Sequence, residues 1–259
     1  MARAIWKGTI TFGSTKVPVK LYSAVEDRTV HFRMLHRKDR QPVKQHMVNP
    51  ETGAVVPYEK IRRGLEIDRG VYVMLEDEEL KELEPADSRD IEITRFVPPT
   101  QITHQWYDHP YYLGPDKDKE AYFGLVQALQ HKDREGVARW VMRRKEYVGA
   151  LRVEGDYLML ITLRNVEEVV PASELPAPEG RDLTSKEVDL ARQLISALES
   201  DFDPTQYRDE YRDRVLELIA TKSKGKRPKV RKLRPKKPPE KSLADALSAS
   251  LAATERKVA

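Results

Sequence analysis

Two stretches near the amino terminus alternate between apolar and polar residues, and this alternation constrains the fold more than any other feature of the chain. The stretch WKGTITFGSTKVPVKLYSA spans residues 6–24, and its regularly spaced apolar residues are Trp6, Ile10, Phe12, Val17, Val19 and Leu21. A period of two is typical of half-buried β-strands, and Gly13-Ser14 indicates a turn between them. Pro18 cannot donate a ladder hydrogen bond, so we expect it at a sheet edge or a bulge. The pattern predicts a hairpin of a β-barrel or a β-sandwich.

Further elements follow along the chain. Short strands are predicted at residues 71–75, 91–97, 147–153 and 157–163, the last two within a β block at 136–163. A helix is expected from Asp116 to about Gln130, with Tyr122, Leu125, Val126 and Leu129 on its buried face. After a linker at 175–180, Thr184 and Glu187 form a capping box for a helix to about residue 200. Another helix is expected to start at 203–205.

Length and composition place limits on the class of protein. The chain has 259 residues, enough to bury a substantial core, and contains no cysteine, so no disulfide or thiolate metal site is possible. No apolar run approaches the ~18 residues of a membrane span, and the amino terminus lacks the apolar core of a signal peptide. We therefore expect a soluble intracellular protein with no membrane partner.

Positive charge is concentrated near the carboxyl end. Residues 222–241 contain eleven Lys or Arg and one acidic residue, for a charge of +10 in a chain whose net charge is +4. The rest of the chain therefore carries −6. Such a segment buries almost nothing, so we expect it to be disordered alone and to bind nucleic acid. Residues 242–253 have the pattern of one weak helix, which either folds against a partner or frays, and we expect fraying.

A second basic region lies at residues 28–69. It holds ten Lys or Arg against five acids, its apolar residues are sparse, and residues 49–53 (NPETG) give a turn signal. This composition predicts an extended hairpin that leaves the core. A solvated surface excursion without function is the alternative.

Residues 76–92 are strongly acidic, with nine Asp or Glu against two basic residues. We expect a short helix at 76–84, with Leu80 and Leu83 facing inward, and a solvated acidic face. Paired carboxylates can serve acid–base or metal chemistry, but no metal-loop spacing occurs here. If the protein binds DNA, this segment should face away from it.

Two other regions allow two interpretations each. The aromatic-rich stretch 101–112 suits a packed aromatic corner better than base stacking. In the β block, Arg139, Arg143, Arg144 and Lys145 either line a positive surface or protect a solvated strand edge.

Six segments in order resemble the bacterial Ku proteins, the homodimeric DNA double-strand-break end-binding proteins of non-homologous end joining. They are the stretch 6–24, IEITRFVPPTQI at 91–102, YYLGPD at 111–116, EYVGALR at 146–152, DYLMLITLR at 156–164, and FDPTQYRDEYRDRVLELIATK at 202–222. Some members of the family carry a cysteine in the region that corresponds to 46–53, and this chain does not.

The resemblance implies a β-rich α+β fold: a Ku-type β-barrel core with an extended arm (bridge) insertion and a C-terminal helical arm, in a ring-forming homodimer. We place the core at 1–172, the DNA-encircling arm within it at about 28–69, the helical arm at 173–222 and a basic disordered extension at 223–259. It also implies sequence-independent binding and bridging of double-stranded DNA ends, and recruitment and stimulation of an ATP-dependent end-joining DNA ligase of the ligase D type. No enzymatic activity, cofactor or metal is implied, and the expected location is the cytoplasm, at the nucleoid.

The expected DNA-binding residues are basic and come from the arm, the β block and the extension. They are Arg33, Arg37, Lys38, Lys44, Lys60, Arg62, Arg63, Arg143, Arg144, Lys224, Lys226, Arg227, Lys229, Arg231, Lys232, Arg234, Lys236 and Lys237. The alternative is a nucleoid-associated, non-specific DNA-binding protein driven by its basic tail. A hidden nuclease or ligase ranks third, because no phosphate-binding loop, nucleophile elbow or metal-ligand spacing is present.

Overall fold

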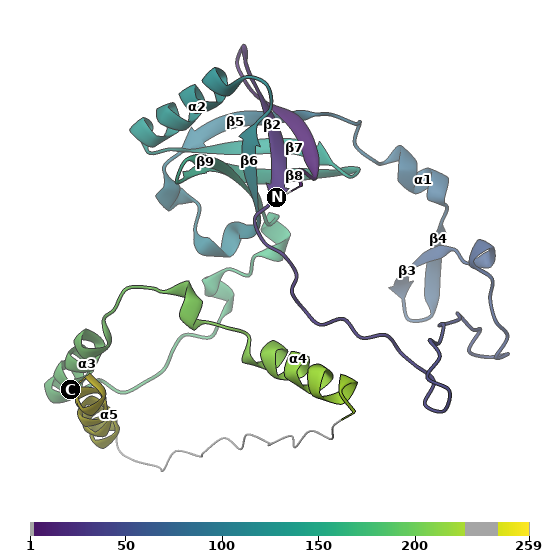
Figure 1. Ribbon diagram of the computed structural model, residues 1–259. Coiled ribbons are helices and arrows are strands. Elements are labelled where there is room, and N and C mark those ends of the chain that lie inside the picture. The colour runs from purple at the N-terminus through teal and green to yellow at the C-terminus, as the bar shows by residue number, and fades with distance from the viewer. Residues whose placement is uncertain (1–2, 226–242, 259) are drawn as a thin grey trace. The chain divides into compact units, whose positions relative to one another are not determined.

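The largest β-structure of the described chain is a closed barrel (Figure 1). The computed structural model describes residues 3–225 and 243–258, and seven strands of this part close the barrel. Around the barrel they are β1 (Trp6–Phe12), β2 (Thr15–Ser23), β6 (Tyr107–Pro115), β9 (Tyr157–Leu163), β8 (Lys145–Glu154), β7 (Glu135–Met142) and β5 (Asp90–Val97). Neighbouring strands are antiparallel except β1 and β5, which run parallel where the barrel closes. Closure leaves the barrel without a free sheet edge. The β-rich α+β class with a β-barrel core is therefore confirmed.

The predicted first hairpin is the β1–β2 pair. Ile10 lies opposite Val17 in the register, and the inward-facing residues are almost completely buried. They are Ile10, Val17, Val19 and Leu21. The period of two in the sequence thus reports the alternation between the barrel interior and its surface.

Pro18 is accommodated at the point where one ladder ends. Strand β2 lies between β1 and β6, so it is not an edge strand. Its ladder with β6 begins only at Val19, which lies opposite Pro115, and Pro18 comes just before it. The missing N–H therefore costs no ladder bond on that side. The carbonyl of Pro18 accepts a hydrogen bond from the backbone N–H of Asp116 (3.0 Å).

Helix α2 (Lys119–Lys132) packs against β2 and β8 and completes the core (Figure 1). All four residues of its predicted apolar face are buried: Tyr122, Leu125, Val126 and Leu129. The hydroxyl of Tyr122 donates to the carbonyl of Leu113 (2.5 Å) and accepts from the backbone N–H of Leu158 (2.9 Å). One buried hydroxyl thus links α2 to β6 and β9.

The start of α2 lies three residues beyond the predicted Asp116. Lys117 has a φ of 78°, which a right-handed helix cannot contain, and Asp118 caps the helix by accepting from the N–H of Ala121 (2.9 Å). The carboxylate of Asp116 instead contacts Lys7 (3.2 Å) and Lys20 (2.9 Å).

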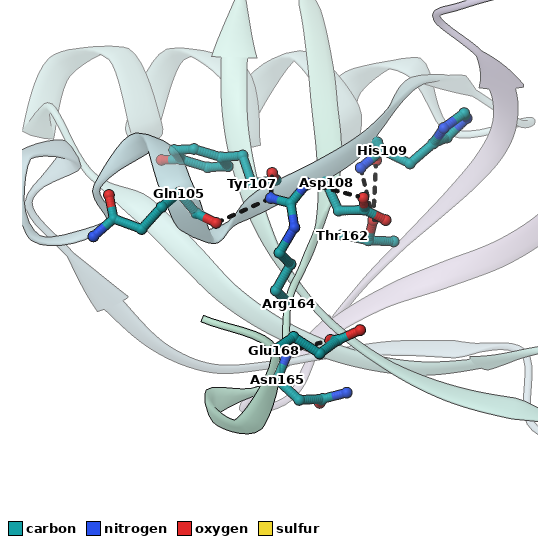
Figure 2. A network of polar contacts seen from close by, with 8 residues as sticks. All are labelled: Gln105, Tyr107, Asp108, His109, Thr162, Arg164, Asn165 and Glu168. Atoms are coloured by element: carbon teal, nitrogen blue, oxygen red, sulfur yellow. Dashed lines mark hydrogen bonds and ion pairs between the residues drawn. The ribbon is translucent and has the colours of Figure 1, made fainter. Parts of the chain in front are cut away.

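A polar network holds the start of β6 against the end of β9, where the ladder between them shifts register (Figure 2). The backbone N–H of His109 donates to the hydroxyl of Thr162 (2.9 Å). The guanidinium of Arg164 donates to the carbonyl of Gln105 (3.0 Å) and contacts the carboxylate of Asp108 (3.3 Å). Side chains therefore satisfy backbone groups that the interrupted ladder leaves unpaired, as is typical of a β-bulge.

The insertion between β2 and β5 is not the single extended hairpin that the sequence suggested. Two isolated bridges join Leu35 to Pro42 and Val48 to Val55, and each closes a short turn. A separate two-stranded sheet follows, made of β3 (Arg63–Asp68) and β4 (Val71–Leu75), with Gly70 at a φ of 76° in its turn. Many backbone groups of this region bond locally, because Pro42, Pro50 and Pro57 interrupt any long ladder.

Helix α1 (Asp77–Glu82) follows β4 within the acidic segment. It lies inside the predicted range of 76–84. Leu83, however, is 81% exposed, so its predicted inward orientation is wrong. Leu83 is the C-cap and keeps a right-handed helical backbone (φ −86°, ψ −9°), so the helical spacing holds and its exposure means that no described element covers this end of the helix.

The chain divides into two compact units, residues 1–28 with 33–174 and residues 29–32 with 175–259. In the second unit, α3 (Ser185–Leu198) begins with the predicted capping box, in which the Glu187 N–H donates to the Thr184 hydroxyl (3.3 Å). Helix α3 contacts α5 (Leu243–Val258). Where fraying was expected, the structure therefore has a continuous helix.

Helix α4 (Glu210–Ser223) begins later than predicted. Asp203 caps only the short 3-10 helix η6 (Pro204–Gln206), and the N-cap of α4 is Asp209, which accepts from the N–H of Arg212 (2.9 Å). The other short 3-10 helices are η1 (Tyr58–Lys60), η2 (Pro99–Gln101), η3 (His104–Trp106), η4 (Val166–Glu168) and η5 (Ala172–Glu174). Across the described residues, no helix combines the length and apolarity that crossing a membrane requires.

Candidate nucleic-acid interface

Five of the predicted DNA-binding side chains lie exposed on the insertion. They are Arg33, Arg37, Lys38, Lys44 and Lys60, and none of them makes an ion pair with a described residue. Cations without a carboxylate partner are available to an external anion. These five residues are the strongest part of the candidate interface.

A small turn presents Arg37 and Lys38 at its tip. The backbone N–H of His36 donates to the carbonyl of Gln41 (2.8 Å), and Asp39 accepts from the N–H of Gln41 (3.0 Å). The imidazole of His36 lies 2.8 Å from the same carboxylate. The bond from the Gln41 N–H and then the contact with His36 hold the pKa of Asp39 below its usual value, so it stays ionised in this turn.

Two further predicted residues are partly neutralised by the acidic segment. Arg62 Nε lies 3.0 Å from Glu76 Oε2, and Arg63 Nε lies 3.8 Å from Asp77 Oδ1. The β3–β4 hairpin causes this pairing, because its register sets Arg63 opposite Leu75, immediately before the two acids. The first residues of the acidic segment therefore lie beside predicted DNA-binding residues, and the expectation that the segment faces away from DNA stays a prediction.

Arg143 and Arg144 form the two-residue turn between β7 and β8. Their φ angles are 54° and 63°, so both residues are left-handed, as in the tight hairpin turn that normally favours Asn-Gly. Arg144 Nε also lies 3.6 Å from Glu84 Oε2. The turn projects two guanidiniums from a rigid barrel hairpin, at a cost in backbone strain.

The extension contributes one described residue to the predicted set. Lys224 follows α4 and is exposed. The remaining predicted residues, from Lys226 to Lys237, lie outside the described part of the chain.

One buried ionic cluster lies apart from these exposed cations. Glu135 is 1% exposed, accepts from the Tyr107 hydroxyl (2.8 Å) and lies 3.4 Å from Arg152. Burial first, and then the contact with Glu135, raise the pKa of Tyr107 to about 12. A tyrosine of that pKa stays protonated near neutral pH, and the contacts of the cluster tie β6, β7 and β8 together.

The described side chains of the predicted DNA-binding set are exposed and spread over the surface. Within residues 3–225 and 243–258, no group of His, Asp and Glu has the arrangement needed to hold a metal ion. The exposed cations of the predicted set lie on irregular segments, turns, a 3-10 helix and a strand end. Scattered surface Arg and Lys contact phosphates, which position a protein on DNA without reading its sequence.

Sequence reasoning missed the carboxylates that pair with the predicted arginines: Glu76, Asp77 and Glu84. The sequence did contain a sign of this pairing, because the acidic segment 76–92 follows the basic region 28–69 after one short strand. Only the hairpin register shows which charges meet.

Comparison with known proteins agrees with the fold. The family model described as the Ku70/Ku80 beta-barrel domain matches residues 11–190. The non-homologous end joining protein Ku of Anaeromyxobacter sp. (strain K) is 38% identical, and the similarity covers 99% of this chain and 88% of the relative. Non-homologous end joining protein Ku 2 of Geotalea uraniireducens is 37% identical over 90% of each chain. The non-homologous end joining protein Ku of Solibacter usitatus is 34% identical, and the similarity covers 99% of this chain and 96% of the relative. The chain therefore belongs to the Ku family.

Proposed function

We propose that the protein binds double-stranded DNA ends without sequence preference, as a homodimeric ring, and acts in non-homologous end joining. The observation that carries the proposal is the set of exposed, unpaired cations on the insertion of a Ku-family barrel. Such cations contact phosphate and sugar, which every DNA sequence presents alike. In this proposal the protein is not an enzyme, and it works in the cytoplasm at the nucleoid.

The proposed homodimer is supported by apolar residues that the described part of one copy leaves exposed. On the β3–β4 sheet, Leu65, Ile67, Tyr72 and Met74 are 61–68% exposed. An isolated two-stranded sheet is only marginally stable in water. A second copy related by a two-fold axis would cover such surfaces and would turn one basic arm into a closed ring.

We also propose that the helical arm recruits the ATP-dependent end-joining ligase, so that the protein bridges ends to that enzyme. The support is a set of exposed aromatic side chains in the second unit. Phe202 and Tyr207 stack with ring centroids 5.4 Å apart, and they are 77% and 74% exposed. Aromatic residues are enriched where proteins bind one another.

Threading over ends is tested by competition. One duplex is prepared as a linear form, as a covalently closed circle, and as a linear form with bulky protein at both ends. We expect the open linear form to compete and the other two to compete poorly, because a closed ring can load only over an end. Equal competition by all three would support the non-specific, tail-driven binder instead.

The insertion is tested by charge reversal in the full chain. The variant combines Arg33→Glu, Arg37→Glu and Lys38→Glu, and a charge-matched control combines Lys16→Glu, Lys119→Glu and Lys186→Glu. We expect the first variant to lose loading while its dimer stays intact, and the control to load normally. If both variants lost loading equally, binding would depend on the net charge of the protein and not on the insertion.

The extension is tested by deleting residues 223–259. Each lost phosphate contact should flatten the dependence of log K on log salt by about 0.9. We expect weaker binding with end preference retained. If the deletion abolished end preference, the proposal that the barrel and the insertion form the ring would be wrong.

A further inference from the structure

An apolar groove opens on the surface between α2 and the ends of β1, β2 and β5. Its volume is about 490 Å³. Leu125 and Leu129 form its floor, and the rings of Phe12 and Phe96 pack edge to face on one side, with centroids 6.2 Å apart. All of these residues belong to the barrel unit. The groove is therefore part of the rigid core surface.

The side of the groove that α2 forms is made of small residues. Ala121, Gly124 and Ala128 lie at helical spacing along it. A Cβ atom at Gly124 would meet no other atom within 4 Å, whereas one at Gly136 would meet Ile93 at 3.1 Å. Packing inside the described part of the protein therefore does not require a glycine at position 124. They leave open a volume within the ~300–1,000 Å³ range that is usual for binding pockets.

Two cations lie at one end of the groove. Lys132 is exposed at the last turn of α2, and Arg134 follows the helix. The Arg134 guanidinium donates to the carbonyls of Lys132 (3.3 Å) and Asp133 (2.8 Å), which fixes its position. Neither cation forms an ion pair with any residue that the structure describes. The groove therefore combines an apolar floor with a positive end that lacks its anion.

We propose that this groove binds an acidic peptide of a partner protein. A bulky apolar side chain of the peptide fills the space beside Gly124, and a neighbouring Asp or Glu contacts Lys132 and Arg134. Duplex DNA does not fit this chemistry, because its phosphates gain nothing from an apolar floor and its bases are stacked inside the helix. The inference is independent of the proposed DNA binding, since it rests on other residues of the barrel.

The test starts from a phage-displayed library of random peptides selected on the full chain. We expect enriched peptides to carry Phe, Leu or Trp beside Asp or Glu. The best peptide is then synthesised, together with a version in which amides replace its carboxylates. Binding should shift the NMR signals of the Ala121 and Ala128 methyl groups, and the amide version should bind less tightly.

Two pairs of variants separate the groove from the rest of α2. Gly124→Leu fills the groove and should weaken binding about tenfold or more, whereas Gln127→Leu adds the same side chain outside it and should not. Lys132→Glu should weaken binding about fivefold, whereas Lys119→Glu makes the same charge change at the other end of the helix and should not. Unchanged thermal unfolding of Gly124→Leu would show that its fold is intact.

Three outcomes would overturn the proposal. Enriched peptides without acidic residues, indifferent to Lys132→Glu, would refute the chemistry. A changed oligomeric state of Gly124→Leu would assign the groove to contact between copies of the chain. If decanoate shifted the NMR signals of the alanine methyl groups and none of the peptides did, the groove would be a binding site for an acyl carboxylate and not for a peptide.

Discussion

Three carboxylates of the acidic segment should compete with DNA for the arginines of the proposed interface. The perturbation is the triple variant Glu76→Gln, Asp77→Asn and Glu84→Gln. These residues pair with Arg62, Arg63 and Arg144 at 3.0, 3.8 and 3.6 Å. If DNA binding requires each arginine to leave its carboxylate, removing the carboxylates should strengthen binding.

The magnitude follows from the exposure of the pairs. The three arginine side chains are 49–71% exposed and their partners 35–67%, so each pair is worth about 0.2–1 kcal/mol. Three such pairs amount to roughly 1.5 kcal/mol, which corresponds to about a tenfold gain in DNA affinity. The slope of log K against log salt should also steepen by up to about 2.7, because three arginines become free to displace counterions from phosphates.

The assay is fluorescence anisotropy with a short blunt-ended duplex over a series of salt concentrations. A charge-matched control removes three other acids of the same segment through Glu78→Gln, Glu82→Gln and Asp87→Asn. None of these acids pairs with a predicted DNA-binding residue in the described chain. If both variants gained the same affinity, general repulsion would explain the gain. If neither did, the three arginines would lie outside the interface.

Three further predictions concern stability. Tyr122→Phe removes a buried hydroxyl that satisfies two backbone groups, and urea unfolding should show a loss of about 2–5 kcal/mol; a loss below about 1 kcal/mol would mean that water replaces it. Replacing Arg143-Arg144 by Asn-Gly should relieve strain, raising stability by about 1–3 kcal/mol while weakening DNA binding; unchanged binding would remove the turn from the interface. The contacts of Glu187 with Arg181 and then Thr184 lower its pKa from 4.5 to about 2. Its stabilisation of α3 is therefore full above about pH 4.5 and is lost as the pH falls towards 2, which amide exchange in α3 should show and which Glu187→Gln should abolish.

Local patterns predicted the elements of the fold well, because their causes are local. The period of two in the first hairpin comes from strand geometry, and the capping box of Thr184 and Glu187 lies within one turn of helix. Element starts were less reliable where several caps compete. Asp203 and Asp209 can both accept a hydrogen bond at the N-terminus of a helix. In the structure Asp203 caps only the one-turn helix η6, and Asp209 caps α4.

The charge contacts of the candidate interface depend on tertiary structure, and the sequence could not predict them. Arg144 and Glu84 are far apart in the chain and meet only because the β7–β8 turn and the end of α1 approach each other. Exposure on the insertion was predictable from its sparse apolar residues. Whether an exposed arginine has a carboxylate beside it was not, since that depends on register and turn geometry.

The chain contains two kinds of arginine–carboxylate pair, one buried and one exposed. Their different costs of separation explain why one arginine keeps its partner and another can exchange it. Arg152 meets a Glu135 whose side chain is 2% exposed, and removing Arg152 would leave this buried carboxylate without its cation at a cost of about 3–5 kcal/mol. Arg144 meets Glu84 at the surface, where exchange of a carboxylate for a phosphate costs well under the ~1 kcal/mol of an exposed pair. The proposed binding to any DNA sequence needs cations that change partners at little cost. The exposed pairs of the acidic segment have that property, and the buried pair of the barrel does not.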